Sequence, residues 1–305
     1  MQWQIGQVAI TTIREQDLHG LELLIPAATP ESVRRIPWLT PHFADAAGQM
    51  HGLIQAFVVE APGRTIVVDT CVGDGKQRRI VPEWHEAQTG FLERFEAAGF
   101  DRDEVDVVLC THLHVDHVGW NTYWDGSAWR PTFPNARYLL ADVEVAHWEA
   151  ERSRPSPDPA TLSDPIAVAL ATFTLDQRQS HADSVQPVLD AGLVDIVPVD
   201  HRLCPQVSLV PTPGHTPGHV SVWIESNAEE AVITGDSMHH PCQIAHPDWV
   251  TAVDADAGQG TASRKALLER SCAAGALLMG SHFAAPTAGR IEADGDGFRL
   301  VTDPR

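Results

Sequence analysis

The chain lacks the cysteine pattern of a disulfide-bonded or thiolate-zinc protein. It has five cysteines in 305 residues, and none of them forms a CxxC pair. An odd, widely spaced set argues against a disulfide framework and offers no thiolate cluster for a structural zinc ion. Cys110 falls in a strand pattern and Cys272 in a helix pattern, so we expect both to be small core residues.

Basic side chains are scarce. The chain has 21 Lys and Arg against 41 Asp and Glu, which gives a formal net charge of -20. Nucleic-acid binding relies on Lys and Arg that neutralise phosphates, so this balance argues against an RNA or DNA partner. Bound cations would cancel part of the negative charge.

Long apolar runs are also missing. No stretch approaches the roughly 18 apolar residues that a membrane-spanning helix requires. The first residues, MQWQIGQVAITTIREQ, show no basic segment followed by an apolar one, as a signal peptide would. We therefore expect a cytoplasmic protein without a membrane partner. The oligomeric state stays open, with a homodimer as one option.

No low-complexity linker divides the chain, so we predict one domain over residues 1–305. Within it, residues 1–52 should form an N-terminal strand and a proline-rich irregular segment near the site. Residues 55–60 and 65–68 predict a hairpin, and residues 84–98 a helix. With the later strand and helix patterns, this order predicts an α/β fold, a mixed sheet in two layers with helices outside.

The stretch VVLCTHLHVDHVG, residues 107–119, carries the clearest chemical signal. Its apolar start predicts a buried strand. The loop that follows holds four candidate ligands, His112, His114, Asp116 and His117. Imidazole and carboxylate groups bind zinc and similar divalent ions, and neighbouring loop side chains point different ways, so the four could serve two ions. The alternative is that these are four surface polar residues without a metal. So many His and Asp residues within six positions are hard to reach by chance, which argues against this alternative.

Three further polar residues follow later strand patterns. His215 lies in PTPGHTPGH, Asp236 follows ITG, and His282 follows MGS. A glycine near each strand end lets the backbone approach closely. Each residue alone could be a capped strand end, but together with the opening motif they complete a set of seven.

Ligand counting offers one division of these seven side chains between two ions. An open position shared by the two ions, filled by water or hydroxide, would make the site catalytic rather than structural. The division gives one ion His112, His114 and His215, gives the other Asp116, His117 and His282, and lets Asp236 bridge both.

The HLHVDH motif and the later His, Asp and His resemble the metallo-β-lactamase superfamily over about residues 52–285. The resemblance implies a four-layer αββα sandwich with the site at one edge of the two sheets. It also bears on Asp69, which follows the second strand of the early hairpin. From the residues alone, Asp69 is equally a turn cap or a carboxylate that orients a metal-binding histidine. The resemblance favours the second role.

Two residues of this chain differ from the pattern of other branches of the superfamily and so limit which branch it resembles. His114 stands where flavodiiron proteins carry Glu, which favours zinc hydrolysis over iron redox chemistry, and Asp236 is usually absent from true β-lactamases. The remaining branch is similar to quorum-quenching lactonases and methyl parathion hydrolase. His239, three residues after Asp236, and the run His282-Phe-x-x-Pro-x-x-Gly look closer to the latter.

The resemblance implies a hydrolase with two divalent metal ions, expected to be Zn2+. A hydroxide that bridges the ions would attack a small-molecule lactone or other carboxylic ester. Asp116 or His239 would pass a proton to the leaving group, although His239 could equally be an ordinary loop residue. Phosphotriester or aryl-ester hydrolysis is the alternative activity, and a non-catalytic metal-binding sensor is the alternative class.

No sequence motif identifies the residues that bind the substrate. We expect Trp38, Phe43 and Trp120 to form part of its wall and to favour an apolar substrate group. Core packing would explain these aromatic residues equally well.

Overall fold

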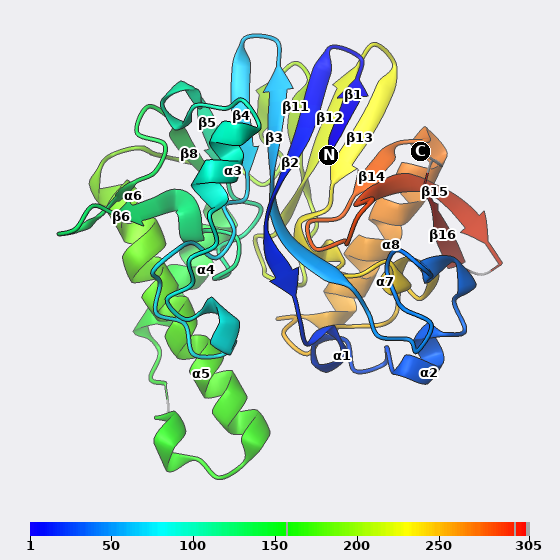
Figure 1. Cartoon of the computed structure of the whole chain (residues 1–305), viewed down its shortest axis with the longest axis horizontal. Coiled ribbons are helices and arrows are strands. Elements are labelled where there is room, and N and C mark those ends of the chain that lie inside the picture. Colours follow the sequence, from blue (N-terminus) through cyan, green and yellow to red (C-terminus); the bar gives the residue numbers. More distant parts are fainter. Residues whose placement is uncertain (157, 296, 303–305) are drawn as a thin grey trace.

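Two seven-stranded sheets lie face to face, with helices against their outer faces (Figure 1). The computed structural model describes residues 1–156, 158–295 and 297–302. This arrangement confirms the predicted α/β sandwich. None of the helices in these ranges is long and apolar enough to cross a membrane.

The first sheet comes from the N-terminal part of the chain. Its strands, in spatial order, are β1 (Gln2–Ile5), β2 (Val8–Leu18), β3 (Gly52–Ala61), β4 (Arg64–Val68), β5 (Val107–Leu109), β8 (Arg137–Ala141) and β9 (Val194–Val197). The first four pair antiparallel, whereas β4, β5, β8 and β9 pair in parallel. The predicted hairpin is β3 and β4.

The second sheet follows chain order. Its strands are β10 (Arg202–Cys204), β11 (Val207–Pro211), β12 (Val220–Ser226), β13 (Glu229–Ile233), β14 (Leu277–Met279), β15 (Ala288–Asp294) and β16 (Gly297–Val301). Only the pair β13 and β14 is parallel. A separate ribbon joins β6 (Thr122–Trp124) to β7 (Trp129–Pro131).

One apolar cluster includes residues from both sheets. Ile10 and Phe57 contribute from the first sheet, and Val222 and Ile224 from the second, each fully buried. Side chains on a strand alternate between its faces, so each strand gives every second residue to this layer and the others to the helices. The large apolar area removed from water holds the two sheets together.

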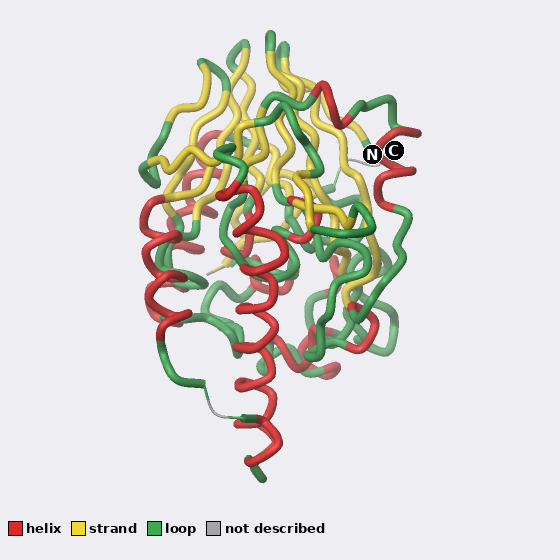
Figure 2. The backbone as a smooth tube through the Cα atoms, turned by 90° about the vertical axis from the view of Figure 1, so that its left-hand side faces the viewer, coloured by secondary structure: helices red, strands yellow, loops and turns green. Residues whose placement is uncertain are grey.

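The helices are α1 (Leu21–Leu24), α2 (Pro30–Val33), α3 (Phe91–Ala97), α4 (Asp142–Ser153), α5 (Pro165–Ser180), α6 (Gln186–Asp190), α7 (Cys242–Ala245) and α8 (Ala257–Ala274). Of these, α3 and α4 contact the first sheet, and α7 and α8 contact the second. A π-helical turn, His181–Val185, joins α5 to α6. Helix α5, labelled in Figure 1, extends well away from the strands, and Figure 2 shows from the side how far helices reach beyond the sheets.

The helix predicted over residues 84–98 is wrong in its first half. Only α3 is α-helical there, and a short 3-10 turn, Pro82–Trp84, precedes it. Glu86 and Gly90 both have positive φ, 50° and 66°. These left-handed positions turn the chain before it can form a continuous helix, and α3 starts after Gly90.

The strands that precede the candidate ligands end at one edge of the sandwich. In the first sheet β4 and β5 run in parallel, so their carboxyl ends lie together. In the second sheet β11 and β13 flank the antiparallel β12 and therefore share a direction, and β14 is parallel to β13. The loops after these five strands meet at the same edge, as for ligand sites in other α/β sheets.

Two buried cations tie the loop after β4 to the end of α5. Arg78 donates two hydrogen bonds of 2.9 Å to the Asp183 carboxylate. Lys76 Nζ donates to Thr122 Oγ1 at 2.7 Å and lies 3.6 Å from both Asp183 Oδ1 and the centre of the Trp129 ring. Burial lowers the pKa of Lys76 to about 7, because the Asp183 charge offsets only part of the desolvation.

Stability should depend on pH through Lys76. Between pH 7 and 10.5 the unfolded lysine holds a proton that the folded lysine has lost. The free energy of unfolding should therefore rise with pH, by at most about 1.4 kcal/mol per pH unit. Urea unfolding between about pH 7 and pH 9.5 should show the wild type gaining stability relative to Lys76→Met. Parallel curves for the two proteins would contradict this.

Candidate metal centre

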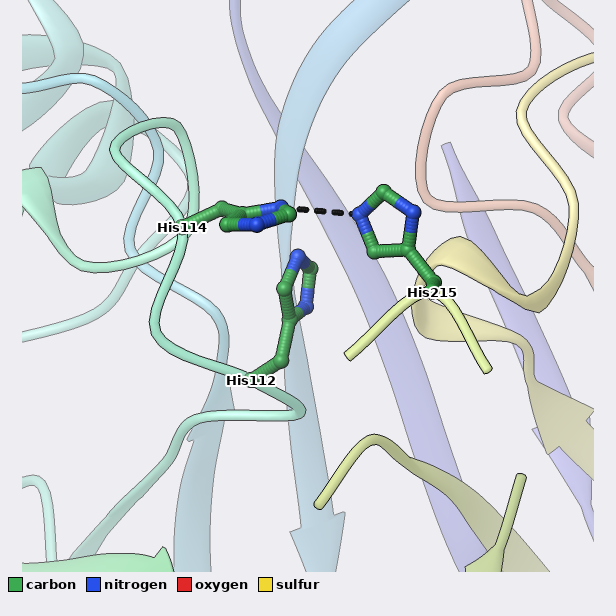
Figure 3. Close-up of side chains that lie close together, drawn as sticks. All are labelled: His112, His114 and His215. Carbon is green, nitrogen blue, oxygen red and sulfur yellow. Dashed lines mark hydrogen bonds between the residues drawn. The ribbon is translucent and has the colours of Figure 1, made fainter. Parts of the chain in front are cut away.

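Two loops bring three histidines together at the sandwich edge (Figure 3). His112 and His114 follow β5, and His215 follows β11. The Nδ1 atom of His114 lies 2.8 Å from the Nε2 atom of His215. One ring nitrogen from each histidine lies within 4.8 Å of the other two. The three imidazoles therefore converge on one point.

A second group lies beside the first. His282, after β14, places its Nε2 atom 3.2 Å from His117 Nε2 and 3.6 Å from Asp116 Oδ2. His117 and Asp116 come from the same loop as His112 and His114. Both predicted groups are therefore among the clusters of His and Asp side chains in the structure, and two further, overlapping clusters include Asp236.

The Asp236 carboxylate lies between the groups. Its Oδ2 atom is 3.5 Å from His215 Nε2 and 3.3 Å from His117 Nε2. Its Oδ1 atom is 3.2 Å from His282 Nε2. His239 Nε2 approaches the same carboxylate, 3.0 Å from Oδ2. The structure thus brings together all seven predicted ligands and places His239 among them.

A tight turn after β13 delivers Asp236. Gly235 has a φ of 56°, and a Cβ atom there would lie 2.6 Å from Nε2 of His219. The Asp236 N–H donates to that Nε2 atom at 2.8 Å. Glycine is therefore required, and His219, the second histidine of PTPGHTPGH, holds the turn in place.

Asp69 supports two of the histidines from behind, His117 directly and His112 through Thr111. Its Oδ2 atom accepts hydrogen bonds of 2.9 Å from His117 Nδ1 and from the Thr111 hydroxyl. The Thr111 oxygen lies 3.2 Å from His112 Nδ1. Engaging Nδ1 leaves Nε2 of each ring directed toward the centre, which is how carboxylates orient histidines in metal sites.

Asp254 and a backbone carbonyl accept hydrogen bonds from the Nδ1 atoms of two other histidine rings and orient them in the same way. Asp254 Oδ1 accepts from His215 Nδ1 at 3.0 Å, and the Leu53 carbonyl accepts from His282 Nδ1 at 3.0 Å. Although burial opposes it, the hydrogen bond from His215 holds the pKa of Asp254 well below its usual range. No strand or motif pattern precedes Asp254, so its contact with His215 could not be predicted from the sequence.

The electrostatics of the centre favour neutral imidazoles at His112 and His114. Burial, aided by the neighbouring histidines, holds the pKa of His112 and of His114 well below the usual value. His117 behaves differently: burial opposes it, but Asp236, Asp69 and Asp116 raise its pKa. Neutral imidazole is the metal-binding form, so His112 and His114 are ready to coordinate a cation.

These residues fit divalent metal ions. Within the described ranges, none of the four carboxylates, Asp69, Asp116, Asp236 and Asp254, forms an ion pair with Lys or Arg. The buried Nε2 atom of His112 has no hydrogen-bond partner there either. Buried charge and unpaired polar atoms are costly. Cations bound between the two groups would remove both costs.

A cavity of about 310 Å³ opens above the centre. Its wall is mainly apolar and comes from the segment after β2, the loop after β4, and α5. The lining residues include Leu18, Leu23, Leu24, Ile80, Val81, Trp84, Ala169 and Phe173, together with His114, Asp116, His215, Asp236, His239 and His282. No Lys or Arg is among the described residues that line it.

The predicted pocket residues lie elsewhere. Phe43 is buried in the core and packs edge-on against Phe283. Trp120 stacks on Phe91, and Trp38 packs against the same core. None of the three predicted residues, Trp38, Phe43 and Trp120, lines the cavity, so the core-packing alternative describes them better.

Residues 51–275 match the family described as the metallo-beta-lactamase superfamily. The chain belongs to this superfamily. Its curated relatives include the N-acyl homoserine lactonase AiiA of Bacillus thuringiensis subsp. kurstaki, 23% identical over 155 residues. That match covers 51% of this chain but only 46% of the relative.

Solved superfamily structures share the fold over the whole chain. AidC, a dizinc quorum-quenching lactonase in complex with a product, covers 100% of this chain and 97% of its own, with a TM-score of 0.78 and 20% identity. The hydrolase AbOPH gives a TM-score of 0.75 and 23% identity over 100% and 97% of the two chains. The predicted superfamily is confirmed. The similarity to lactonases agrees with the predicted branch, while the likeness to methyl parathion hydrolase stays a prediction.

Replacing Asp254 should weaken metal binding. Asp254→Asn removes the charge that orients His215, and such outer partners typically contribute about 10- to 100-fold in metal affinity. Zinc titration against a competing chelator would measure the change. Asp256→Asn is the matched control, because Asp256 caps α8 and asparagine caps equally well. Equal affinities in both variants would contradict the role of Asp254.

Proposed function

We propose that this protein is a metal-dependent hydrolase that opens a lactone or cleaves another small carboxylic ester. One observation carries the proposal: two groups of His and Asp side chains share Asp236 at the floor of an apolar cavity. The likeness to lactonases supports the ester class, since several relatives are N-acyl homoserine lactonases.

The chain's own residues would hold two ions, which we propose to be zinc. The proposed assignment is His112, His114 and His215 to one ion, Asp116, His117 and His282 to the other, and Asp236 to both. Ions in such sites supply Lewis acidity and a water of lowered pKa. Asp69 and Asp254 fix the rings of His117 and His215, so that the ligands are oriented before substrate arrives.

The cavity selects neutral substrates. Its described lining carries carboxylates and imidazoles but neither Lys nor Arg, so a carboxylate or phosphate on the substrate would have no basic partner. Leu23, Val81 and Phe173 instead offer apolar surface to the part of the substrate away from the ester. An uncharged lactone with an apolar substituent suits this wall.

His239 and Asp116 both line the cavity and are our candidates to protonate the leaving oxygen. His239 Nε2 contacts Asp236, and its buried Nδ1 atom has no hydrogen-bond partner among the described residues. Asp116 is the most exposed of the proposed carboxylate ligands, with 15% of its side chain accessible. Both groups can therefore reach a substrate held over the centre.

Metal loading should control activity. We expect about two zinc ions per chain and hydrolysis of N-acyl homoserine lactones that is lost on chelation and restored by zinc. Asp236→Ala should lower kcat/KM by at least about 100-fold, because it removes the group shared by both ions. Asp190→Ala, an exposed position on α6, is the control.

Metal content by mass spectrometry and kcat/KM on a substrate panel would test this. Fewer than one ion per chain, or full activity in Asp236→Ala, would contradict the proposal. A higher kcat/KM on a nitrophenyl phosphotriester than on any lactone would assign the alternative activity. No hydrolysis of lactones, esters or phosphotriesters by the metal-loaded protein would favour a non-catalytic sensor.

The role of His239 is testable through the leaving group. An alkoxide needs a proton as it departs, whereas a nitrophenolate does not. His239→Phe should therefore lower kcat by about 100-fold on a lactone and only slightly on a nitrophenyl ester, since general acid catalysis typically contributes 10²- to 10⁴-fold. Equal losses on both substrates would show that His239 only shapes the site.

A further inference from the structure

We propose that Glu144 is a positioning residue that sets the distance between the two loops carrying His112, His114 and His215. The inference rests on the proposed metal-dependent function. It assigns a role to a residue of α4 that lies outside the metal clusters.

Glu144 uses both carboxylate oxygens, one on each loop. Its Oε1 atom accepts from the Leu113 N–H at 3.0 Å and from the Trp148 indole at 2.6 Å. Its Oε2 atom accepts from the Thr216 hydroxyl at 2.7 Å and from the Gly218 N–H at 3.1 Å. Four donors satisfy a carboxylate that is 1% exposed.

The contacts fall beside the ligands. Leu113 lies between His112 and His114, and Thr216 directly follows His215. The carboxylate is planar and rigid, so holding one loop on each oxygen limits how far the loops can separate. The distance between His114 Nδ1 and His215 Nε2, 2.8 Å, is therefore constrained from behind by this side chain, in addition to the hydrogen bond from the Val220 N–H to the Thr111 carbonyl.

Close packing on the same side supports this role. A Cβ atom on Gly218 would lie 2.2 Å from the backbone nitrogen of Glu144. Only glycine lets the His215 loop approach the start of α4 closely enough for the Gly218 N–H to reach Oε2. Helix and loop thus fit together at the point where the carboxylate joins them.

A second helix holds the other side of the His112 loop. Gln177 on α5 accepts from the Val115 N–H at 2.7 Å and donates to the Leu113 carbonyl at 3.0 Å. Its hydrogen bonds fix this loop alone, whereas Glu144 reaches the His215 loop as well. The relative placement of the two loops therefore depends on Glu144 rather than on Gln177.

The charge of Glu144 adds to the geometry. Its four hydrogen-bond donors are neutral backbone, indole and hydroxyl groups, and no Lys or Arg in the described part of the chain forms an ion pair with it. Charge-assisted hydrogen bonds are stronger than neutral ones, and an unpaired carboxylate nearby favours cation binding. Replacing it by the neutral amide should weaken both effects.

A matched pair of variants tests the proposal. Glu15 is also buried and accepts hydrogen bonds from two backbone amides, Val72 and Gly73, and from the Trp120 indole. Its two backbone partners lie in the loop after β4, which carries none of the proposed ligands. Glu144→Gln and Glu15→Gln thus remove the same kind of carboxylate, only one of which joins ligand loops.

Zinc titration of the full-length proteins against a competing chelator is the readout. In Glu144→Gln one of the two dissociation constants should rise about 10- to 100-fold while the other is unchanged. Glu15→Gln should bind both ions as the wild type does. If Glu144→Gln fails to fold, Thr216→Val removes one of the four hydrogen bonds with little change of shape and should weaken the same ion several-fold.

Two results overturn the proposal without affecting the proposed function. They are wild-type affinity for both ions in the folded Glu144 or Thr216 variant, and an equal loss in Glu15→Gln. A wild-type protein that binds no zinc would overturn the proposed function and this inference together.

Discussion

The buried carboxylate of Asp236 is the constraint on which the site depends. Imidazoles from three separate loops lie within 3.5 Å of it, His117, His215 and His282. Although burial opposes it, the charges of the surrounding histidines hold its pKa well below the usual range, so it remains ionised. A buried negative charge must be compensated, and with no Lys or Arg paired to it in the described part of the chain, this falls to protonated neighbouring histidines or to bound cations.

The order and direction of the strands bring the residues around Asp236 together. The strands β4, β5, β11, β13 and β14 all end at one edge, so residues nearly 170 positions apart, such as Asp116 and His282, come within 3.6 Å. Behind them a layer of carboxylates, Asp69, Asp254 and Glu144, fixes backbone amides and ring nitrogens. The rigid sandwich therefore sets the geometry, and the loops above it supply the apolar wall of the cavity.

Much of this could be predicted from local patterns. His112 to His117 stand in one short motif, and each remaining ligand follows a readable strand, so the chain order alone indicated which residues would meet. Glu144, Gln177 and Asp254 could not be found this way, because each acts through a contact between distant elements and has no sequence signature. The predicted pocket residues do not line the cavity for a related reason: an aromatic side chain such as Phe43 or Trp120 fits a core and a pocket equally well until packing is known. The helix over residues 84–98 was overextended because left-handed positions at Glu86 and Gly90 interrupt an otherwise helical pattern.

The central claim is that two cations share Asp236. Anomalous diffraction from crystals grown with zinc, recorded on both sides of the zinc absorption edge, tests it most directly. We expect two peaks, one among His112, His114 and His215 and the other among Asp116, His117 and His282, with the Asp236 carboxylate between them. A single peak, or two peaks of which one lies outside these groups, would contradict it.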